Sequence, residues 1–153
     1  MRTIPTLIAI IVTSFNAYAV DDEVVIKEMA NRTTLRIEEI RMHYKTGCDS
    51  GITPYMNICS SYHNVAADME LNEVYQALIK QLTTKQAKEK LVKAQRVWLS
   101  FRDLTCDYES DGWVGGTGES MNVLSCKARI TGARTNQLKE YLNCTSPGCP
   151  GEW

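Results

Sequence analysis

Six cysteines in a chain of 153 residues constrain the fold more than any other feature. An even set of cysteines in a short chain is typical of exported proteins, in which disulfides staple a small core. Pairing between sequence neighbours is favoured but not required, so other pairings stay open. We assign the cysteines a structural role and predict the pairs Cys48–Cys59, Cys106–Cys126 and Cys144–Cys149.

Residues 1–19 have the pattern of a cleavable signal peptide, with Arg2 before an apolar run and small residues at Ala17 and Ala19. The apolar run is shorter than the roughly 20 residues of a membrane-spanning helix. The first cysteine, Cys48, is also far from the cleavage site and cannot carry a lipid there. We therefore expect an exported chain without a membrane anchor.

Charge and length exclude some functions. The formal net charge of −1 becomes −2 once Arg2 is removed with the leader, and this acidic balance argues against a nucleic-acid partner. Residues 20–153 suit a single domain that can bury one core.

The first part of this domain has apolar residues at helical spacing. Together they predict one amphipathic helix within residues 20–47, ended by Gly47. The members of the stripe are Ile26, Ala30, Thr33, Ile37, Ile40 and Tyr44.

A second segment, opened by Pro54, carries two apolar stripes on nearly opposite faces, with the change near Met69. This pattern fits either a helix that is buried on two sides or a break near Met69. We favour the continuous helix. The two stripes are Tyr55, Ile58, Tyr62, Val65 and Met69, and then Ala67, Leu71, Tyr75, Leu78 and Leu82.

Two further helices complete the domain. Thr83 and Gln86 form a candidate capping box for the third helix, whose apolar stripe, from Ala87 through Leu91, Ala94 and Trp98 to Phe101, we interpret as core. The fourth helix spans about Met121 to Leu142. The predicted fold class is all-α, a small disulfide-stapled bundle of about four helices, with residues 48–143 as the main helical domain and residues 144–153 as a disulfide-closed tail.

His43 and His63 offer an alternative in which cysteines and histidines form a catalytic pair or a metal site. Neither histidine has ligand-like spacing. A disulfide sulfur is neither a nucleophile nor a zinc ligand, so we interpret both histidines as surface or boundary residues.

The segment between the last two helices, Asp107–Glu119, alternates acids and then becomes rich in glycine. Its start resembles a calcium loop, with Gly112 as the sharp turn. The twelfth position, where a bidentate Glu belongs, is Gly118, so the register fails by one residue. The candidate oxygen ligands are Asp107, Glu109 and Asp111, and Glu119 stands one residue too late to close the loop.

The same segment is a candidate partner-binding loop. Gly115, Gly116 and Gly118 do not follow a strand, which argues against phosphate binding. Trp113 and the acids could instead face a partner, because aromatic anchors with charged rims are common in interfaces. The alternative is that Trp113 packs over the helix ends.

Polar residues on the second and third helices form another cluster. We find no nucleophile–base pair and no paired carboxylates, so we predict neither an enzyme nor a cofactor. Arg102 and Asp103 are expected to point in different directions, with partners on the preceding helix. We interpret the cluster as a polar network inside the bundle, formed by Asp68, Asn72, Gln95, Arg96, Arg102 and Asp103.

Several motifs together resemble the LprI-type lysozyme-inhibitor domain of bacterial exported proteins. The resemblance runs from about Cys48 to Leu142. Its most specific part is Ala94-Gln95-Arg96-x-Trp98-x-x-Phe101-Arg102-Asp103-x-x-Cys106. The other parts are Met56-Asn57-x-Cys59, Ala67-Asp68-x-x-Leu71-Asn72-x-x-Tyr75, Gly115-Gly116-x-Gly118, Cys126, Thr131 and Arg134.

This resemblance implies a helical periplasmic or secreted domain that binds lysozyme, or another peptidoglycan-degrading enzyme, and blocks its attack on cell-wall glycan. Such an inhibitor needs only to cover the cleft between two catalytic carboxylates. We expect the Asp107–Glu119 segment to do so with Trp113 as anchor. An immunity-type or general envelope-binding protein with another target, and a calcium-binding helical module, remain the alternatives.

Overall fold

The computed structural model describes residues 20–145 and 147–151, so the predicted signal peptide, residues 1–19, lies outside the described residues. Within the described ranges the chain has five α-helices, one short 3-10 helix and no strand, which confirms the all-α prediction. The elements are α1 (Asp22–Arg32), α2 (Ile37–His43), α3 (Thr53–Gln81), α4 (Lys85–Glu109), η1 (Asp111–Trp113) and α5 (Glu119–Leu142).

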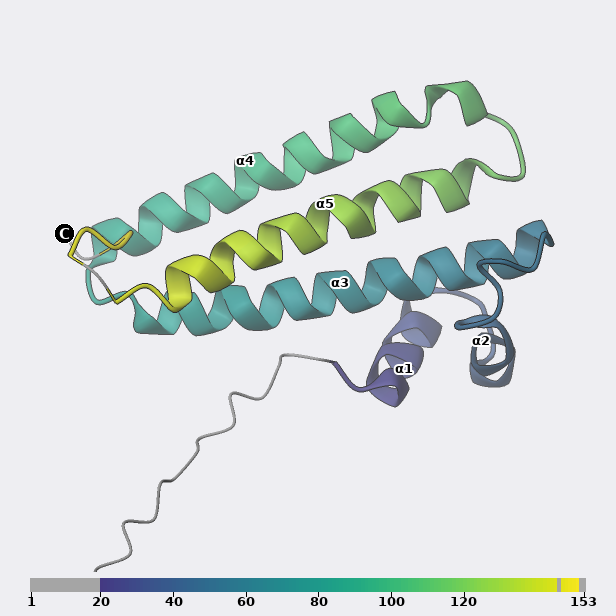
Figure 1. Cartoon of the computed structure of the whole chain (residues 1–153), viewed down its shortest axis with the longest axis horizontal. Coiled ribbons are helices and arrows are strands. Elements are labelled where there is room, and N and C mark those ends of the chain that lie inside the picture. The colour runs from purple at the N-terminus through teal and green to yellow at the C-terminus, as the bar shows by residue number, and fades with distance from the viewer. Residues whose placement is uncertain (1–19, 146, 152–153) are drawn as a thin grey trace, which may run out of the picture.

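Three long helices dominate the molecule. Figure 1 shows α5 between α3 and α4, with the short α1 and α2 beside the amino-terminal half of α3. The most extensive packing is between α3 and α5. No helix of the described ranges has both the length and the apolarity that crossing a bilayer requires.

The expected single helix within residues 20–47 is wrong, because the segment forms two helices. α1 ends at Arg32, and the residue that caps it, Thr33, has an extended backbone. The Thr33 hydroxyl donates to the Met29 carbonyl (2.9 Å) and accepts from the Leu35 backbone N–H (3.3 Å), so it replaces helical hydrogen bonds at the break. α1 and α2 still share one core, which explains why the stripe continues across the break. The buried residues of this core are Val25, Ile26, Met29, Ile40, Ile58, Tyr62 and Val65.

Asp22, at the start of α1, joins the two short helices to α3. Its carboxylate accepts hydrogen bonds from Tyr44 (3.0 Å) and Tyr62 (2.5 Å) and pairs with Lys45 (2.7 Å). The hydrogen bond from Lys45, followed by those from Tyr62 and Tyr44, lowers the pKa of Asp22 from 3.8 to about 2. The ionised form of Asp22 therefore favours the docked arrangement.

Asp22→Asn is expected to reduce the acid sensitivity of the fold. A carboxyl with a depressed folded-state pKa stabilises the fold above its unfolded pKa of 3.8, and this contribution is lost as the pH falls through about 2. The melting temperatures of the two proteins should therefore differ most near neutral pH and converge in acid. Thermal unfolding at a series of pH values measures this, with the exposed Asp49→Asn as control. Equal pH profiles of Asp22→Asn and the unchanged protein would contradict the role of Asp22.

The continuous second helix is confirmed as α3, which has no break near Met69. Its first half packs on the α1–α2 core through Ile58 and Val65. Its second half packs on Leu138 of α5, through Leu71, Val74 and Leu78. The change of apolar face along the sequence is thus a change of packing partner.

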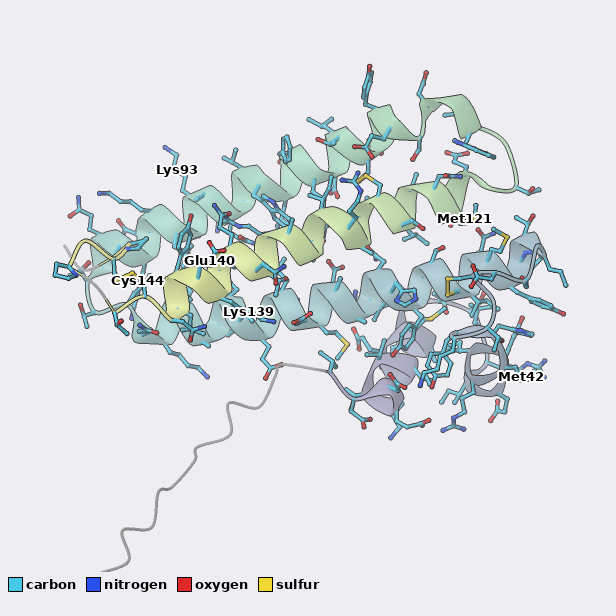
Figure 2. The ribbon with its side chains drawn as sticks, viewed as in Figure 1. Met42, Lys93, Met121, Lys139, Glu140 and Cys144 are labelled. Atoms are coloured by element: carbon cyan, nitrogen blue, oxygen red, sulfur yellow. A yellow bond between two sulfur atoms is a disulfide. The ribbon has the colours of Figure 1, made fainter. Side chains whose placement is uncertain are left out.

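α4 differs from its sequence interpretation in two ways. Its N-cap is Thr84, which accepts from the Ala87 N–H (3.1 Å), and not Thr83. Its apolar stripe is core only in part, since Leu91 and Trp98 pack against the core between α3 and α5 whereas Ala94 and Phe101 are exposed. The fully buried positions of α4 are Gln95, Arg102 and Cys106. The reason is that α4 packs mainly on α5, at the edge of the bundle. Figure 2 shows the Lys93 side chain leaving α4 on the side away from α5.

The three disulfides are those that sequence proximity favours. Cys48–Cys59 ties the segment after α2 to α3, Cys106–Cys126 joins α4 to α5, and Cys144–Cys149 closes the tail. Closing the loop between α4 and α5 is worth about 3 kcal/mol in the chain-entropy account of crosslinks.

Candidate functional site

The segment from Asp107 to Glu119, hereafter the connector, forms one end of the bundle. Its first residues complete the last turn of α4, its middle is η1, and its last residue begins α5. Figure 1 shows this connector at the opposite end of the long helices from the carboxyl-terminal tail. The Cys106–Cys126 disulfide lies directly before it on α4. The connector is therefore a protruding end with a covalent base.

A series of tight turns orders the connector backbone. The Trp113 N–H donates to the Ser110 carbonyl (2.9 Å), and the Gly116 N–H donates to the Trp113 carbonyl (2.9 Å). Gly115 has a φ of 77°, a conformation that suits glycine, and its N–H donates to Glu119 Oε2 (2.7 Å). Glu119 thus serves the turn and not a ligand.

Two glycines give Trp113 its position. A Cβ at Gly118 would lie 3.3 Å from the Trp113 ring, and a Cβ at Gly116 would lie 3.1 Å from the Trp113 carbonyl oxygen. The ring thus packs over the start of α5, which agrees with the alternative prediction that Trp113 packs over the helix ends. It is nevertheless 51% exposed, so the same ring also offers an apolar surface to solvent.

Side chains of α3 and α5 also hold the connector. Asn57 Nδ2 of α3 donates to the Thr117 carbonyl (3.3 Å), and Asn122 Nδ2 of α5 donates to the Gly118 carbonyl (2.8 Å). These bonds, together with the disulfide, hold the connector in one conformation before any partner arrives. Preorganisation of this kind reduces the entropy cost of binding.

A groove of about 890 Å³ lies beside the connector. The connector, the start of α5, the first turns of α3, the α1–α2 linker and α2 all contribute lining residues. Asn57 Oδ1, at this groove, is buried without a hydrogen-bond partner among the described residues. No sequence pattern indicates the groove, because its lining comes from separate segments: Thr33, Leu35, Glu39, Thr53, Pro54, Asn57, Ile58, Ser61, Thr117, Ser120 and Leu124.

The calcium interpretation of the connector is wrong for geometric reasons. Asp107 and Glu109 both lie on α4, where residues two positions apart point in different directions. Glu109 pairs with Arg129 (2.5 Å), and Glu119 accepts from the connector backbone. Asp111, in η1, lies beyond the end of α4. The four acids therefore do not converge on one point.

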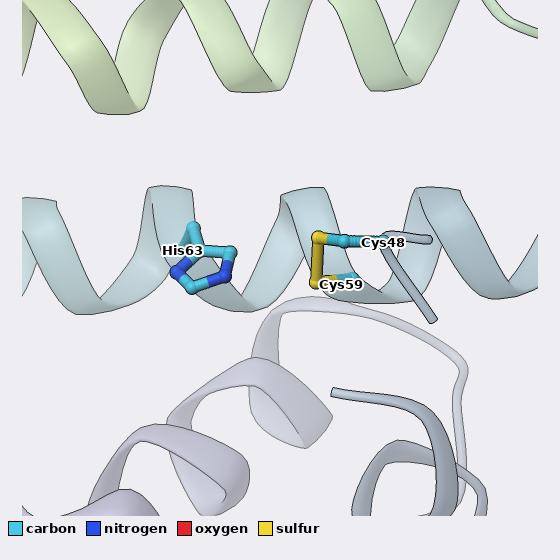
Figure 3. A group of neighbouring side chains, drawn as sticks. All are labelled: Cys48, Cys59 and His63. Carbon is cyan, nitrogen blue, oxygen red and sulfur yellow. A yellow bond between two sulfur atoms is a disulfide. The ribbon is translucent and has the colours of Figure 1, made fainter. Parts of the chain in front are cut away.

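One cluster of metal-type side chains does exist in the described part of the chain, formed by Cys48, Cys59 and His63 (Figure 3). Both sulfurs are consumed by the Cys48–Cys59 disulfide and cannot act as thiolate ligands. The other histidine, His43, stacks on Tyr55 with ring centroids 3.7 Å apart. His63 thus lies beside a structural disulfide, and His43 packs on an aromatic ring.

The polar cluster of the second and third predicted helices is centred on Arg102, which is nearly buried. Its guanidinium donates to Asp68 Oδ1 (2.8 Å) on α3 and to Thr131 Oγ1 (3.1 Å) on α5. It also donates to Asp103 (3.1 Å), so the expectation that Arg102 and Asp103 point apart is wrong. One side chain thus links all three long helices.

The remaining predicted members of this network divide into two groups. Gln95 is buried and accepts from Arg134 (3.1 Å), a partner on α5. Asn72 and Arg96 are solvent-exposed and lie outside the network. Trp98 packs beside both arginines, with Arg102 at 5.4 Å and Arg134 at 5.9 Å from its ring centroid.

The surroundings of the network act differently on its two titratable groups, favouring the charged form of Asp103 and disfavouring that of Arg134. Burial alone would raise the pKa of Asp103, but hydrogen bonds from Lys127 and Arg102 outweigh it, and the pKa lies below its ordinary value. Burial lowers the pKa of Arg134. These groups satisfy one another, which is what a network that fixes helix register requires.

Comparison with known proteins identifies the family of this chain. Residues 48–138 match the protein family described as Lysozyme inhibitor LprI, and this match covers more than half of the chain. The chain belongs to the LprI family. An uncharacterized protein of Rhizobium meliloti (strain 1021) is 37% identical over 99 residues, which are 57% of this chain and 71% of that protein. No solved structure matches the chain.

The LprI match contains both the connector and the Arg102 network, together with two of the three disulfides. α1, α2 and the Cys144–Cys149 tail lie outside it. The family part of the molecule is thus the unit of α3, α4 and α5. The short amino-terminal helices lie outside the match and pack on one face of α3.

Proposed function

We propose that this protein is an exported inhibitor that binds a lysozyme, or another peptidoglycan-degrading enzyme, and covers its cleft with the connector. The observation that carries the proposal is the half-exposed Trp113 on an ordered, disulfide-based connector, in a chain that belongs to a family described as lysozyme inhibitors.

Inhibition by this surface requires no chemistry from the inhibitor. Lysozyme-type glycosidases act through two carboxylates that flank the sugar chain in a cleft, so a protein that fills the cleft excludes substrate. Trp113 supplies a rigid aromatic anchor, and the groove beside the connector can receive a side chain from the rim of the enzyme. Exposed Asp107 and Asp111 favour encounter with a basic enzyme.

An oxidising compartment fits the covalent structure. Three disulfides crosslink the described part of the chain, and disulfides persist in the periplasm or outside the cell. The predicted leader of residues 1–19 would direct the chain there. Export places the inhibitor where cell-wall glycan is attacked.

The test is a titration of the oxidised chain, residues 20–153, into lysozymes of the main structural types while cell-wall clearing is followed. We expect saturable inhibition of at least one type at near-equal stoichiometry. If no type is inhibited at an excess of the protein, the proposal fails. Inhibition that survives reduction of the disulfides with loss of the connector structure would also contradict the assigned surface.

Gly118→Val is expected to weaken inhibition, because its side chain would displace the Trp113 ring that packs 3.3 Å from the Cβ position. Gly112→Val is the matched control in the same connector, since a Cβ there meets nothing within 4 Å. We expect inhibition constants to rise about tenfold or more for Gly118→Val and to change little for Gly112→Val. Equal effects of the two substitutions would show that the position of Trp113 does not matter.

A further inference from the structure

The solvent side of α4 is apolar over its second half. Four large side chains on it are well exposed: Val97 (64%), Phe101 (58%), Leu104 (69%) and Tyr108 (83%). The positions that α4 buries, Gln95, Arg102 and Cys106, lie on a different face, toward α5. A contiguous exposed apolar face of this kind marks an interaction surface.

The spacing of this face is that of a coiled-coil seam. Its positions follow one another at intervals of four and three residues, the heptad pattern in which an apolar stripe faces a partner helix. We call this set the α4 seam. Its members are Lys90, Ala94, Val97, Phe101, Leu104 and Tyr108, all of them exposed.

A shallow groove of about 520 Å³ runs along the amino-terminal half of the seam. Lys90, Ala94 and Val97 lie along it, and Phe101 closes one end. A hole bordered by residues of one helix is what a knob from a facing helix fills. The seam therefore offers holes in its first half and large knobs in its second half.

The charges beside the seam select the direction of a partner helix. Lys93 and Asp107 are exposed and lie two heptads apart, hence on the same flank. In parallel copies this flank would face the opposite flank of the other helix, where Leu91, Trp98 and Thr105 lie, so neither charge would meet an opposite one. Antiparallel copies would place Lys93 of each chain against Asp107 of the other, which is attractive. Figure 2 shows that Lys93 projects away from α5, where a second molecule can reach it.

The sizes of the seam residues also fit the antiparallel arrangement. In the register that pairs all six, small side chains face large ones, and the aliphatic stem of a lysine covers a tyrosine ring with its ammonium group free for the π face. Each pair occurs twice around the two-fold axis. The pairs are Ala94 with Leu104, Val97 with Phe101, and Lys90 with Tyr108.

We propose that the α4 seam binds a second copy of this chain, so that the protein is an antiparallel, two-fold symmetric dimer through α4. Such an interface is self-complementary, as two-fold dimers require. The 25-residue α4 is about 37 Å long at 1.5 Å per residue, so the dimer would hold its two connectors at opposite ends. The proposal does not depend on the identity of the enzyme that the connectors bind.

Sedimentation velocity of the oxidised chain over a wide range of concentration tests the dimer. We expect a mass of two chains that dissociates on dilution, and a loss of the dimer in Phe101→Asp without a change in the melting temperature measured at a dilution where the unchanged protein is a single chain. Met42→Asp is the matched control, because Met42 is similarly exposed (62%) but lies on α2. A single-chain mass at every concentration, or equal effects of Phe101→Asp and Met42→Asp, would overturn the proposal.

Charge exchange tests the antiparallel direction. Lys93→Asp alone should weaken the dimer, because it places two acids together at each end of this flank of the seam. Adding Asp107→Lys should restore the dimer, since each pair again joins opposite charges, with the acid and the base exchanged. A double variant that dissociates as readily as Lys93→Asp would overturn the antiparallel register.

Discussion

Trp113→Ala is expected to abolish most of the inhibitory affinity while leaving the fold intact. Truncating an aromatic anchor at the centre of an interface costs about 2–4 kcal/mol, which is a loss of about thirtyfold to nearly a thousandfold in affinity. The ring is half-exposed in the free protein, so its removal exposes little of the core. Calorimetric titration of the target enzyme measures the loss.

Met42→Ala is the control for this experiment, since Met42 is an exposed apolar side chain on α2. It should bind the enzyme as the unchanged protein does. Unchanged affinity of Trp113→Ala, with Met42→Ala also unchanged, would remove the connector from the inhibitory surface and direct attention to other faces of the bundle.

Asp68→Ala is expected to destabilise the fold by about 3 kcal/mol, because it removes a carboxylate from a nearly buried arginine. The side chain of Arg102 is only 10% exposed and that of Asp68 is 23% exposed, so water cannot readily replace the lost partner. The free energy of unfolding in denaturant measures the effect. A loss below about 1 kcal/mol would mean that Arg102 does not depend on this carboxylate.

Two further variants separate the buried charge from the lost contact. Asp103→Ala removes a more exposed partner (48%) of the same arginine and should cost less than Asp68→Ala. Arg102→Met combined with Asp68→Ala should recover part of the stability, because no unpaired charge is then left inside the bundle. A double variant less stable than Asp68→Ala alone would contradict this explanation.

Much of the fold could be predicted from the sequence because helix periodicity and cysteine spacing are local signals. The two-faced stripe around Met69 correctly indicated a continuous α3, and the disulfides join cysteines that are close in sequence. The break at Thr33 was missed because α1 and α2 present their apolar residues to the same core, which keeps the stripe in phase across the break.

The sequence misled at α4 for a different reason. An apolar stripe predicts a face that avoids water, but it does not say which surface covers that face. Phe101 was interpreted as core, although in the single chain it is exposed and the polar Gln95 and Arg102 are buried instead. Local pattern thus identified the helix and assigned its inner face incorrectly.

The candidate site shows the same division between local and distant information. The glycines and Trp113 of the connector are contiguous and could be singled out from the sequence. The groove beside them, and the contact from Asn57 to Thr117, join residues that are far apart in the chain. The resemblance includes Thr131 as a motif position without a role, whereas its hydroxyl accepts a hydrogen bond from Arg102.

The Cys106–Cys126 disulfide also sets the order in which the molecule can open. α4 packs mainly on α5, and the covalent link lies at the connector end of this pair, whereas side-chain contacts such as Gln95 with Arg134 hold the rest. While this disulfide is intact, a separation of α4 from α5 that starts at the Lys85 end cannot pass Cys106. Such a partial opening leaves the base of the connector joined to α5, so the surface that carries Trp113 is covalently protected against it.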